Sequence, residues 1–186
     1  ATDDERIQSC VSDLGVEAVM TDSELPSGTD RIWAAISDAK CDVVLNVQGD
    51  EPLIPPALIN QVAQNLASNE NAGMATLSIS IDDMEEFLNP NAVKVVASDS
   101  GQALYFSRAP IPWPRDNVDE LPPYYKAQRH IGIYAYRVSF LKQFVTWPIS
   151  CLEQTEKLEQ LRAMSNGVVI HVAQACEVPP AGIDTQ

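Results

Sequence analysis

The chain of 186 residues is poor in cysteine, histidine and basic side chains, and each shortage argues against a class of function. The four cysteines are far apart and form no CxxC pair, and only two histidines are present, so a structural zinc site is not expected. Lysine and arginine number 12 against 26 aspartates and glutamates, which gives a net charge of −14. Nucleic acids and anionic membranes would be repelled by such a chain, so we expect neither as a partner.

Long apolar runs are also missing. No run approaches the roughly 20 residues that a membrane-spanning helix needs, and the polar, acidic first residues argue against a signal peptide. Scattered free thiols favour a reducing compartment and hence the cytoplasm, with one or two disulfides in a secreted protein as the alternative. The 45% hydrophobic and 20% charged residues are typical of a globular protein, and the length suits one domain.

Helical and strand patterns alternate along the chain, which predicts an α/β fold. The expected helices cover residues 2–14, 29–39, 55–67, 82–88, 140–144 and 151–164. The expected strands cover residues 16–20, 43–47, 73–81, 92–97, 103–107, 129–136 and 168–173. The run 43–47 is almost entirely apolar, which is typical of a central parallel strand covered on both faces. A hairpin turn at 98–101 makes the sheet mixed, and a proline-rich excursion occupies residues 109–123.

The most informative position is Asp50, which follows that apolar strand and Gly49. Ligands of open α/β sheets bind beyond the carboxyl ends of strands, where an aspartate is well placed to hold Mg²⁺. A solvated turn in which Asp50 caps a helix explains the same pattern equally well. Asp184, near the end of the chain, is either a second metal ligand or a loop residue.

Other polar positions have two interpretations each. The run 27–31 (SGTDR) leads into a helix, whose free backbone N–H groups bind an anion or a base edge, although an ordinary helix cap is the commoner explanation. Single arginines most often serve solubility. The acidic and amide side chains on the helix from Cys151 are individually expected on a solvated face; they are Glu153, Glu156, Glu159 and Gln160.

Nine short sequence motifs, spread along almost the whole chain, occur in a fixed order. They are 21–22 (TD), 27–31 (SGTDR), 44–52 (VLNVQGDEP), 89–96 (NPNAVKVV), 103–109 (ALYFSRA), 111–113 (IPW), 129–134 (RHIGIY), 158–162 (LEQLR) and 182–185 (GIDT). In combination they are highly specific, and they resemble the 3-deoxy-manno-octulosonate cytidylyltransferases, or CMP-Kdo synthetases. That family joins CTP to the eight-carbon sugar acid Kdo, which gives CMP-Kdo and pyrophosphate for lipopolysaccharide assembly.

The resemblance implies a Rossmann-like nucleotidyltransferase fold with a mixed, mostly parallel sheet, a homodimer and a Mg²⁺ cofactor. It implies that Asp50 and Asp184 bind the metal and that Ser27, Gly28 and Gln48 contact the cytidine. It implies a sugar-acid pocket, with Arg108 as a catalytic group that pairs with the sugar carboxylate; the pocket residues are Arg31, Arg108, His130, Tyr134, Glu159 and Gln160. The segment with Pro112 and Trp113 would lie at the dimer contact.

In the family, a first strand and the loop that grips the CTP triphosphate come before the position of Ala1, and a final helix follows Gln186. We therefore expect residues 1–186 to form one nucleotidyltransferase domain, incomplete at both ends, with exposed apolar edges and little or no activity alone. Three alternatives stay open. They are a sister cytidylyltransferase for another sugar acid such as a sialic acid, a non-catalytic binding module of the same fold, and a generic α/β protein in which Asp50 only caps a helix.

Overall fold

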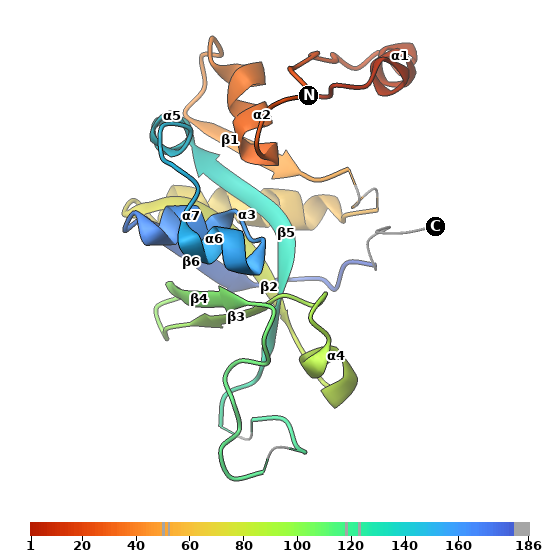
Figure 1. Ribbon diagram of the computed structural model, residues 1–186. Coiled ribbons are helices and arrows are strands. Elements are labelled where there is room, and N and C mark those ends of the chain that lie inside the picture. The colour runs from red at the N-terminus through yellow and green to blue at the C-terminus, as the bar shows by residue number, and fades with distance from the viewer. Residues whose placement is uncertain (50, 52, 118, 123, 181–186) are drawn as a thin grey trace.

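The computed structural model describes residues 1–49, 51, 53–117, 119–122 and 124–180, and it has a single six-stranded sheet at its centre (Figure 1). The strands run in the order β4-β3-β5-β2-β6, and β1 pairs with β5 beside this path. Their bounds are β1 Val43–Val47, β2 Ala72–Ser80, β3 Lys94–Ala97, β4 Ala103–Ser107, β5 Gln128–Arg137 and β6 Val169–Gln174.

The sheet is mixed, as predicted, but the expectation that it is mostly parallel is wrong. Among the described residues, β5 runs antiparallel to β1, β2 and β3, β3 runs antiparallel to β4, and the β2–β6 pair is parallel. An apolar run reports burial on both faces and carries no information on strand direction. Both β2 and β5 are buried along most of their length because they occupy the middle of the sheet, although their shared ladder is antiparallel.

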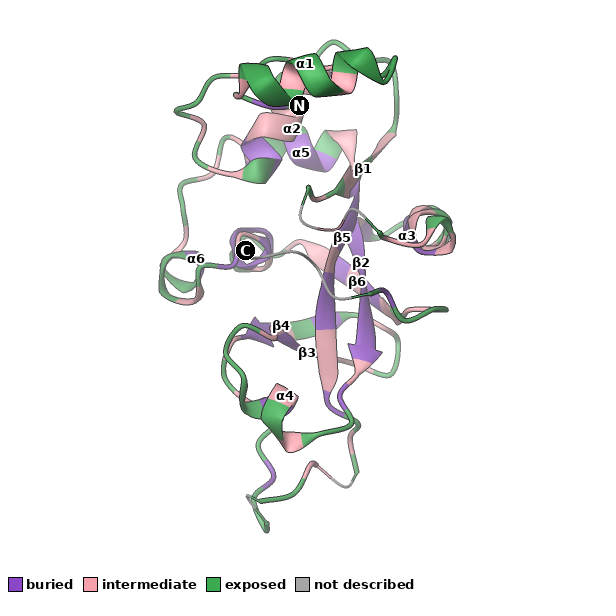
Figure 2. Cartoon of the chain, turned by 90° about the vertical axis from the view of Figure 1, so that its right-hand side faces the viewer, coloured by how far each residue is buried: buried purple, intermediate pink, exposed green. Residues whose placement is uncertain are grey.

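Helices cover both faces of the sheet (Figure 2). On one face, α3 (Pro56–Ser68) packs Leu58, Val62 and Leu66 against β2 and β5. On the other face, α5 (Val138–Phe144) and α7 (Gln160–Ser165) pack against β2, β5 and β6, together with α2 (Gly28–Ile36). By contrast, α1 (Glu5–Asp13) contributes no buried residue.

Two expectations for the first fifty residues were wrong in part. The strand at 43–47 has the predicted bounds, but it pairs only with residues 133–137, the second half of β5. Its residues are half-buried or exposed, and none is fully buried. Residues 16–20 form no strand; Thr2 and Met20 make an isolated parallel bridge. An apolar sequence is necessary for a central strand, but it does not determine which strands pair.

The predicted helix 151–164 is two helices, α6 (Cys151–Glu156) and α7. The break is at Lys157, whose φ of 54° lies in the left-handed region and ends α6. In a continuous helix, residues nine apart lie on opposite faces and about 13.5 Å apart along the axis. Here Arg162 instead reaches Glu153 with two hydrogen bonds of 2.8 and 2.6 Å, which only the break allows.

The lower end of the molecule carries α4 (Met84–Leu88), the β3–β4 hairpin and the proline-rich excursion, which leaves the body between β4 and β5 (Figure 1). Along the excursion Trp113 is 56% exposed and Tyr124 is 98% exposed. Within the part of the chain that the structure describes, no helix combines the length and the apolar character needed to cross a membrane.

Candidate active site

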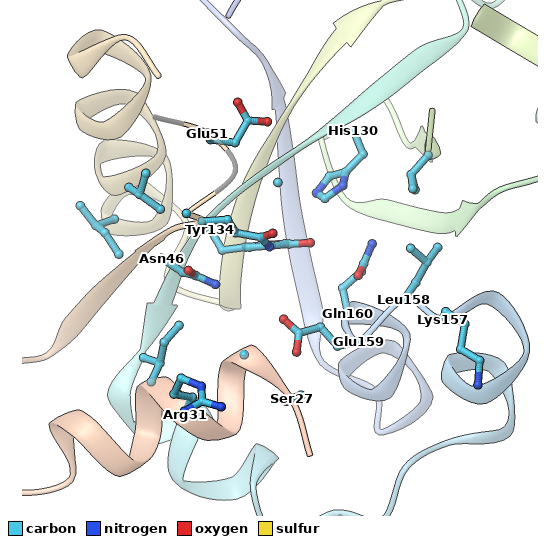
Figure 3. A pocket seen from close by; sticks show the side chains of 18 of the residues that line it. Ser27, Arg31, Asn46, Glu51, His130, Tyr134, Lys157, Leu158, Glu159 and Gln160 are labelled. Carbon is cyan, nitrogen blue, oxygen red and sulfur yellow. The ribbon is translucent and has the colours of Figure 1, made fainter. Parts of the chain in front are cut away.

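A cavity of about 1150 Å³ opens between the start of α2, the end of β1, the middle of β5 and the α6–α7 junction (Figure 3). It brings together every described residue that the sequence predicted for the site. These are Ser27, Gly28, Arg31, Gln48, Arg108, His130, Tyr134, Glu159 and Gln160. The predicted residues that the cavity brings together are up to 133 positions apart in the sequence, from Ser27 to Gln160. Their individual roles stay predictions.

The start of α2 provides polar backbone at the cavity wall. Ser27 is the helix cap, because its Oγ accepts a hydrogen bond of 3.2 Å from the Asp30 backbone N–H, and it donates one of 2.5 Å to the Asp30 carboxylate. A Cβ at Gly28 would meet no atom within 4 Å, so the glycine leaves open space beside the first turn. The Thr29 N–H donates to Glu159 over 3.4 Å and the Asp30 N–H to Ser27, so this wall offers a ligand the open space at Gly28 and the polar groups around it.

Arg31 faces the same cavity, but its guanidinium is held by the N-terminal segment. It donates to Thr21 Oγ1 over 2.5 Å and forms an ion pair of 2.8 Å with Asp3. The side chain therefore ties the first residues of the chain to α2 at the cavity rim.

β5 bulges where it crosses the cavity floor. The pairing with β2 jumps from Leu77–Ile131 to Thr76–Tyr134, so Gly132 and Ile133 have no partner in that ladder. The Thr76 hydroxyl lies at the bulge, within 3.1 Å of the Ile131 carbonyl oxygen and 2.7 Å of the Ile133 carbonyl oxygen. A bulge of this kind redirects side chains, and here it keeps His130 and Tyr134 on the cavity face.

His130 is neutral in this setting. Burial first, and then the neighbouring Arg129 charge, lower the pKa of His130 to about 3. Its ring lies in a row of aromatic rings, 5.1 Å from Phe106 and 5.3 Å from Tyr134 between centroids. Burial also raises the pKa of Tyr134, with smaller contributions from Tyr136 and Glu159, so this phenol stays protonated. The floor of the cavity therefore offers uncharged hydrogen-bonding groups.

The α6–α7 junction supplies the opposite wall. Glu159 accepts a hydrogen bond of 2.9 Å from the Thr29 hydroxyl, which links this wall to α2. Gln160 is 3% exposed, and its Nε2 has no hydrogen-bond partner among the described residues. A buried amide donor without a partner costs free energy, so binding sites are among the places where one is retained.

A buried ion network behind this wall was not predicted from the sequence. The Arg162 guanidinium is 2% exposed, pairs with both oxygens of Glu153, lies 3.6 Å from the Asp30 carboxylate and stacks 4.3 Å above the Phe144 ring. Glu153 was expected on a solvated helix face, and it is instead 7% exposed. Glu153 forms a capping box with Ser150 at the start of α6, but no local pattern reveals a partner nine residues away across a helix break.

Arg108 lines the cavity with part of its guanidinium already engaged. Nε donates to the Glu156 carbonyl over 2.7 Å, and the other two nitrogens donate to the carbonyls of Pro90 and Lys157. Three of the five N–H donors of a guanidinium are thereby used on neutral oxygens, and two remain. Its charge is therefore not cancelled by these contacts, and a carboxylate ligand has donors to pair with.

The charge of the cavity differs from that of the whole chain. Its described lining includes four cationic side chains, Arg31, Arg108, Arg129 and Lys157, against two carboxylates, Glu51 and Glu159. The chain as a whole carries −14. Two of these cations are already paired, Arg31 with Asp3 and Arg129 with Glu86 over 2.6 Å. The described lining is therefore much less acidic than the chain as a whole, and Arg108 and Lys157 are the cations placed to meet an anionic ligand.

The two predicted metal ligands, Asp50 and Asp184, lie outside the described residues. Gln48, Gly49 and Glu51, the described neighbours of position 50, all line the cavity. Among the described residues there is no group of three histidine, cysteine or acidic side chains that could hold a metal ion by itself. A pair of carboxylates fits Mg²⁺, which takes hard oxygen ligands and commonly completes its shell with water and phosphate.

Comparison with known proteins identifies close relatives. The family model described as cytidylyltransferase matches residues 1–170. The 3-deoxy-manno-octulosonate cytidylyltransferases of Cellvibrio japonicus and Hahella chejuensis are 57% and 55% identical, with 100% of this chain and 76% of each relative covered. A structure of a CMP:2-keto-3-deoxy-manno-octonic acid synthetase complexed with CTP matches with a TM-score of 0.90 at 38% identity, over 99% of this chain and 73% of that one. The match confirms the predicted Rossmann-like nucleotidyltransferase fold.

Proposed function

Because the chain belongs to the cytidylyltransferase family, and within it to the 3-deoxy-manno-octulosonate cytidylyltransferases, we propose that its cavity is the site that couples CTP to Kdo. The products would be CMP-Kdo and pyrophosphate. The observation that carries the proposal is the convergence of all nine described candidate residues on one cavity. Both substrates are anions, and four cationic side chains line this cavity in a chain of net charge −14.

The walls of the cavity divide naturally between the two substrates. The start of α2 at Ser27 and Gly28, with Gln48 after β1, would bind the cytidine through backbone and amide groups. Across the cavity, His130, Tyr134, Glu159 and Gln160 offer neutral and acceptor groups suited to the hydroxyls of a sugar. Arg108 would pair with the sugar carboxylate through its two remaining donors, and Arg31 would add positive charge at the rim.

Asp50 and Asp184 would hold Mg²⁺, which when bound supplies positive charge that neutralises the phosphates during phosphoryl transfer. The residues of this chain then have the task of orientation. They hold the sugar hydroxyl in line with the α-phosphate and keep its carboxylate fixed, and such positioning lowers a barrier by several kcal/mol. A divalent ion is also consistent with the small number of carboxylates at the cavity.

The decisive assay is pyrophosphate release from CTP and Kdo with Mg²⁺. We would run it on this chain and on a chimaera extended by the flanking segments of the Cellvibrio japonicus relative. Asp50→Asn should lower turnover by two or more orders of magnitude, since it removes a charge from the proposed metal site, and EDTA should abolish the reaction. Asp38→Asn, the same change at an exposed position after α2, should leave turnover unaltered. Near-normal turnover of the Asp50→Asn variant would contradict the metal assignment.

The substrate assignment has its own test. Offering Kdo and a sialic acid to the same enzyme separates the two sugar-acid alternatives, and we expect CMP-Kdo to form much faster. Preference for the sialic acid would refute the assignment while leaving the cytidylyltransferase activity in place. Absence of any CMP-sugar from the extended chimaera would favour the binding-module interpretation.

We also propose a homodimer in the cytoplasm. The excursion exposes Trp113 and Tyr124 beside a second, smaller cavity of about 310 Å³, which supports its use as a contact between two copies. The four cysteines are unpaired and exposed, which supports a reducing compartment. Sedimentation velocity on the purified chain measures the oligomeric state directly.

A further inference from the structure

The hydrogen bonds around Thr76 determine where the proton of His130 lies. The Thr76 side chain is fully buried, and its Oγ1 lies 2.9 Å from His130 Nε2, 2.7 Å from the Ile133 carbonyl oxygen and 3.1 Å from the Ile131 carbonyl oxygen. A hydroxyl has one proton, and a carbonyl oxygen only accepts. The Thr76 proton must therefore point toward the carbonyls, because otherwise two carbonyl oxygens would face the hydroxyl lone pairs at these short distances.

With its proton directed at a carbonyl, Thr76 Oγ1 presents a lone pair to the imidazole. His130 Nε2 must then carry the hydrogen and donate it. A neutral imidazole has one N–H, so Nδ1 is left with a lone pair. Among the described residues Nδ1 has no hydrogen-bond partner, and His130 lines the cavity.

We propose that Thr76 is a positioning residue that fixes His130 as the Nε2–H tautomer, so that Nδ1 accepts a hydrogen bond from a hydroxyl of the sugar acid. The second half of this inference rests on the proposed function, whereas the first half concerns the free protein alone. The β5 bulge is what makes the arrangement possible, since it brings two carbonyls of one strand to a single hydroxyl.

The role follows from the chemistry of the ring. His130 is buried at the floor, its ring lies near those of Phe106 and Tyr134, and the adjacent Arg129 carries a positive charge. These surroundings oppose a second proton on the ring, so His130 acts as a hydrogen-bond acceptor and does not relay protons. A ring with the proton on Nδ1 would offer a donor at the same place and would suit a different ligand group.

The test begins with nitrogen NMR of the ¹⁵N-histidine-labelled chain without ligand. We expect the Nε2–H pattern for His130 at pH 7, with His171→Gln assigning the only other histidine. Thr76→Val keeps the side-chain shape but removes the hydroxyl, so it should give a mixture of both tautomers, and Thr76→Ser should restore the single form. Ser78→Ala is the matched control, because Ser78 is on the same strand face and its hydroxyl donates to Gln128 and not to His130.

Calorimetric titration with Kdo tests the acceptor role. Thr76→Val should weaken Kdo binding about five- to tenfold, the range of one neutral hydrogen bond, with Thr76→Ser close to the wild type and CTP binding changed less than twofold. His130→Asn, whose amide oxygen can replace Nδ1, should bind Kdo more tightly than His130→Gln, which replaces only the Nε2 end.

Each result decides something. An Nδ1–H pattern in the wild-type chain, or an unchanged Nε2–H pattern in Thr76→Val, overturns the role of Thr76. A shifted tautomer with unaltered Kdo affinity overturns the acceptor role. Failure of the wild type to bind any Kdo counts against the proposed substrate, and the tautomer spectrum still decides the role of Thr76. Should Thr76→Val fail to fold, Thr76→Ala, which also lacks the hydroxyl, takes its place, and the wild-type spectrum still decides the tautomer.

Discussion

Acidification should destabilise this protein through His130. In the folded chain the pKa of His130 is lowered to about 3, chiefly by burial, whereas an unfolded chain has the ordinary value near 6.5. Below pH 6.5 the unfolded state therefore binds a proton that the folded state does not. Stability from the neutral ring is complete above pH 6.5 and is lost progressively as the pH falls from 6.5 toward 3.

The size of the effect follows from the two pKa values. Integrating the difference in bound protons from pH 7 to pH 5 gives a loss of about 2 kcal/mol in the free energy of unfolding, with an upper limit of about 5 kcal/mol at still lower pH. Two kcal/mol is a large part of the 5–15 kcal/mol typical of a domain. The loss should therefore appear as a shift of the urea transition to lower urea concentration, at pH values above those of general acid denaturation.

Urea unfolding followed by tryptophan fluorescence from pH 8 to pH 4.5 measures this loss. The comparison is with His130→Gln, which can still donate to Thr76 but does not titrate. Carboxylates and His171 contribute equally to both proteins, so subtracting one curve from the other isolates His130. We expect the gap between the two proteins to change by about 2 kcal/mol between pH 7 and pH 5. Parallel curves over this range would refute the buried, neutral assignment.

Two further predictions concern the cavity wall and the excursion. Gln160→Met should raise the free energy of unfolding by about 1 kcal/mol, because it removes a buried amide donor that has no partner among the described residues. The same variant should bind Kdo more weakly in calorimetry. If it is less stable than the wild type, the amide has a hydrogen-bond partner after all. Trp113→Asp should convert the proposed dimer to monomers in sedimentation velocity, with little change in melting temperature. Val16→Asp, at a position of similar exposure, should leave the dimer intact. A dimeric Trp113→Asp variant would place the contact elsewhere.

Local patterns in the sequence predicted local structure well. The β3–β4 hairpin forms at its predicted turn, and the helix expected from residue 29 begins at Gly28, capped by Ser27. Each of these depends on residues within a few positions of one another. Side-chain capping and turn geometry are short-range effects, so the sequence expresses them directly.

Features that depend on long-range contacts were harder to predict. The Lys157 break is explained by the bond between Glu153 and Arg162, and the half-exposed position of β1 is explained by its pairing with β5. Neither can be seen in hydrophobic periodicity. The members of the cavity were predicted because the resemblance carried them as a set; from their spacing alone, an ordinary helix cap or a solvated face was the commoner interpretation of each.

The Arg162 network has a consequence for protein engineering. The same guanidinium contacts a carboxylate at the start of α2 and one in α6, and it extends from α7, which begins at Gln160. The loop at Ser27 and the segment 150–165 are thus parts of one interlocked unit. Replacing either segment alone with that of a cytidylyltransferase of different specificity would leave a buried charge without its partner. Both segments therefore have to be replaced together.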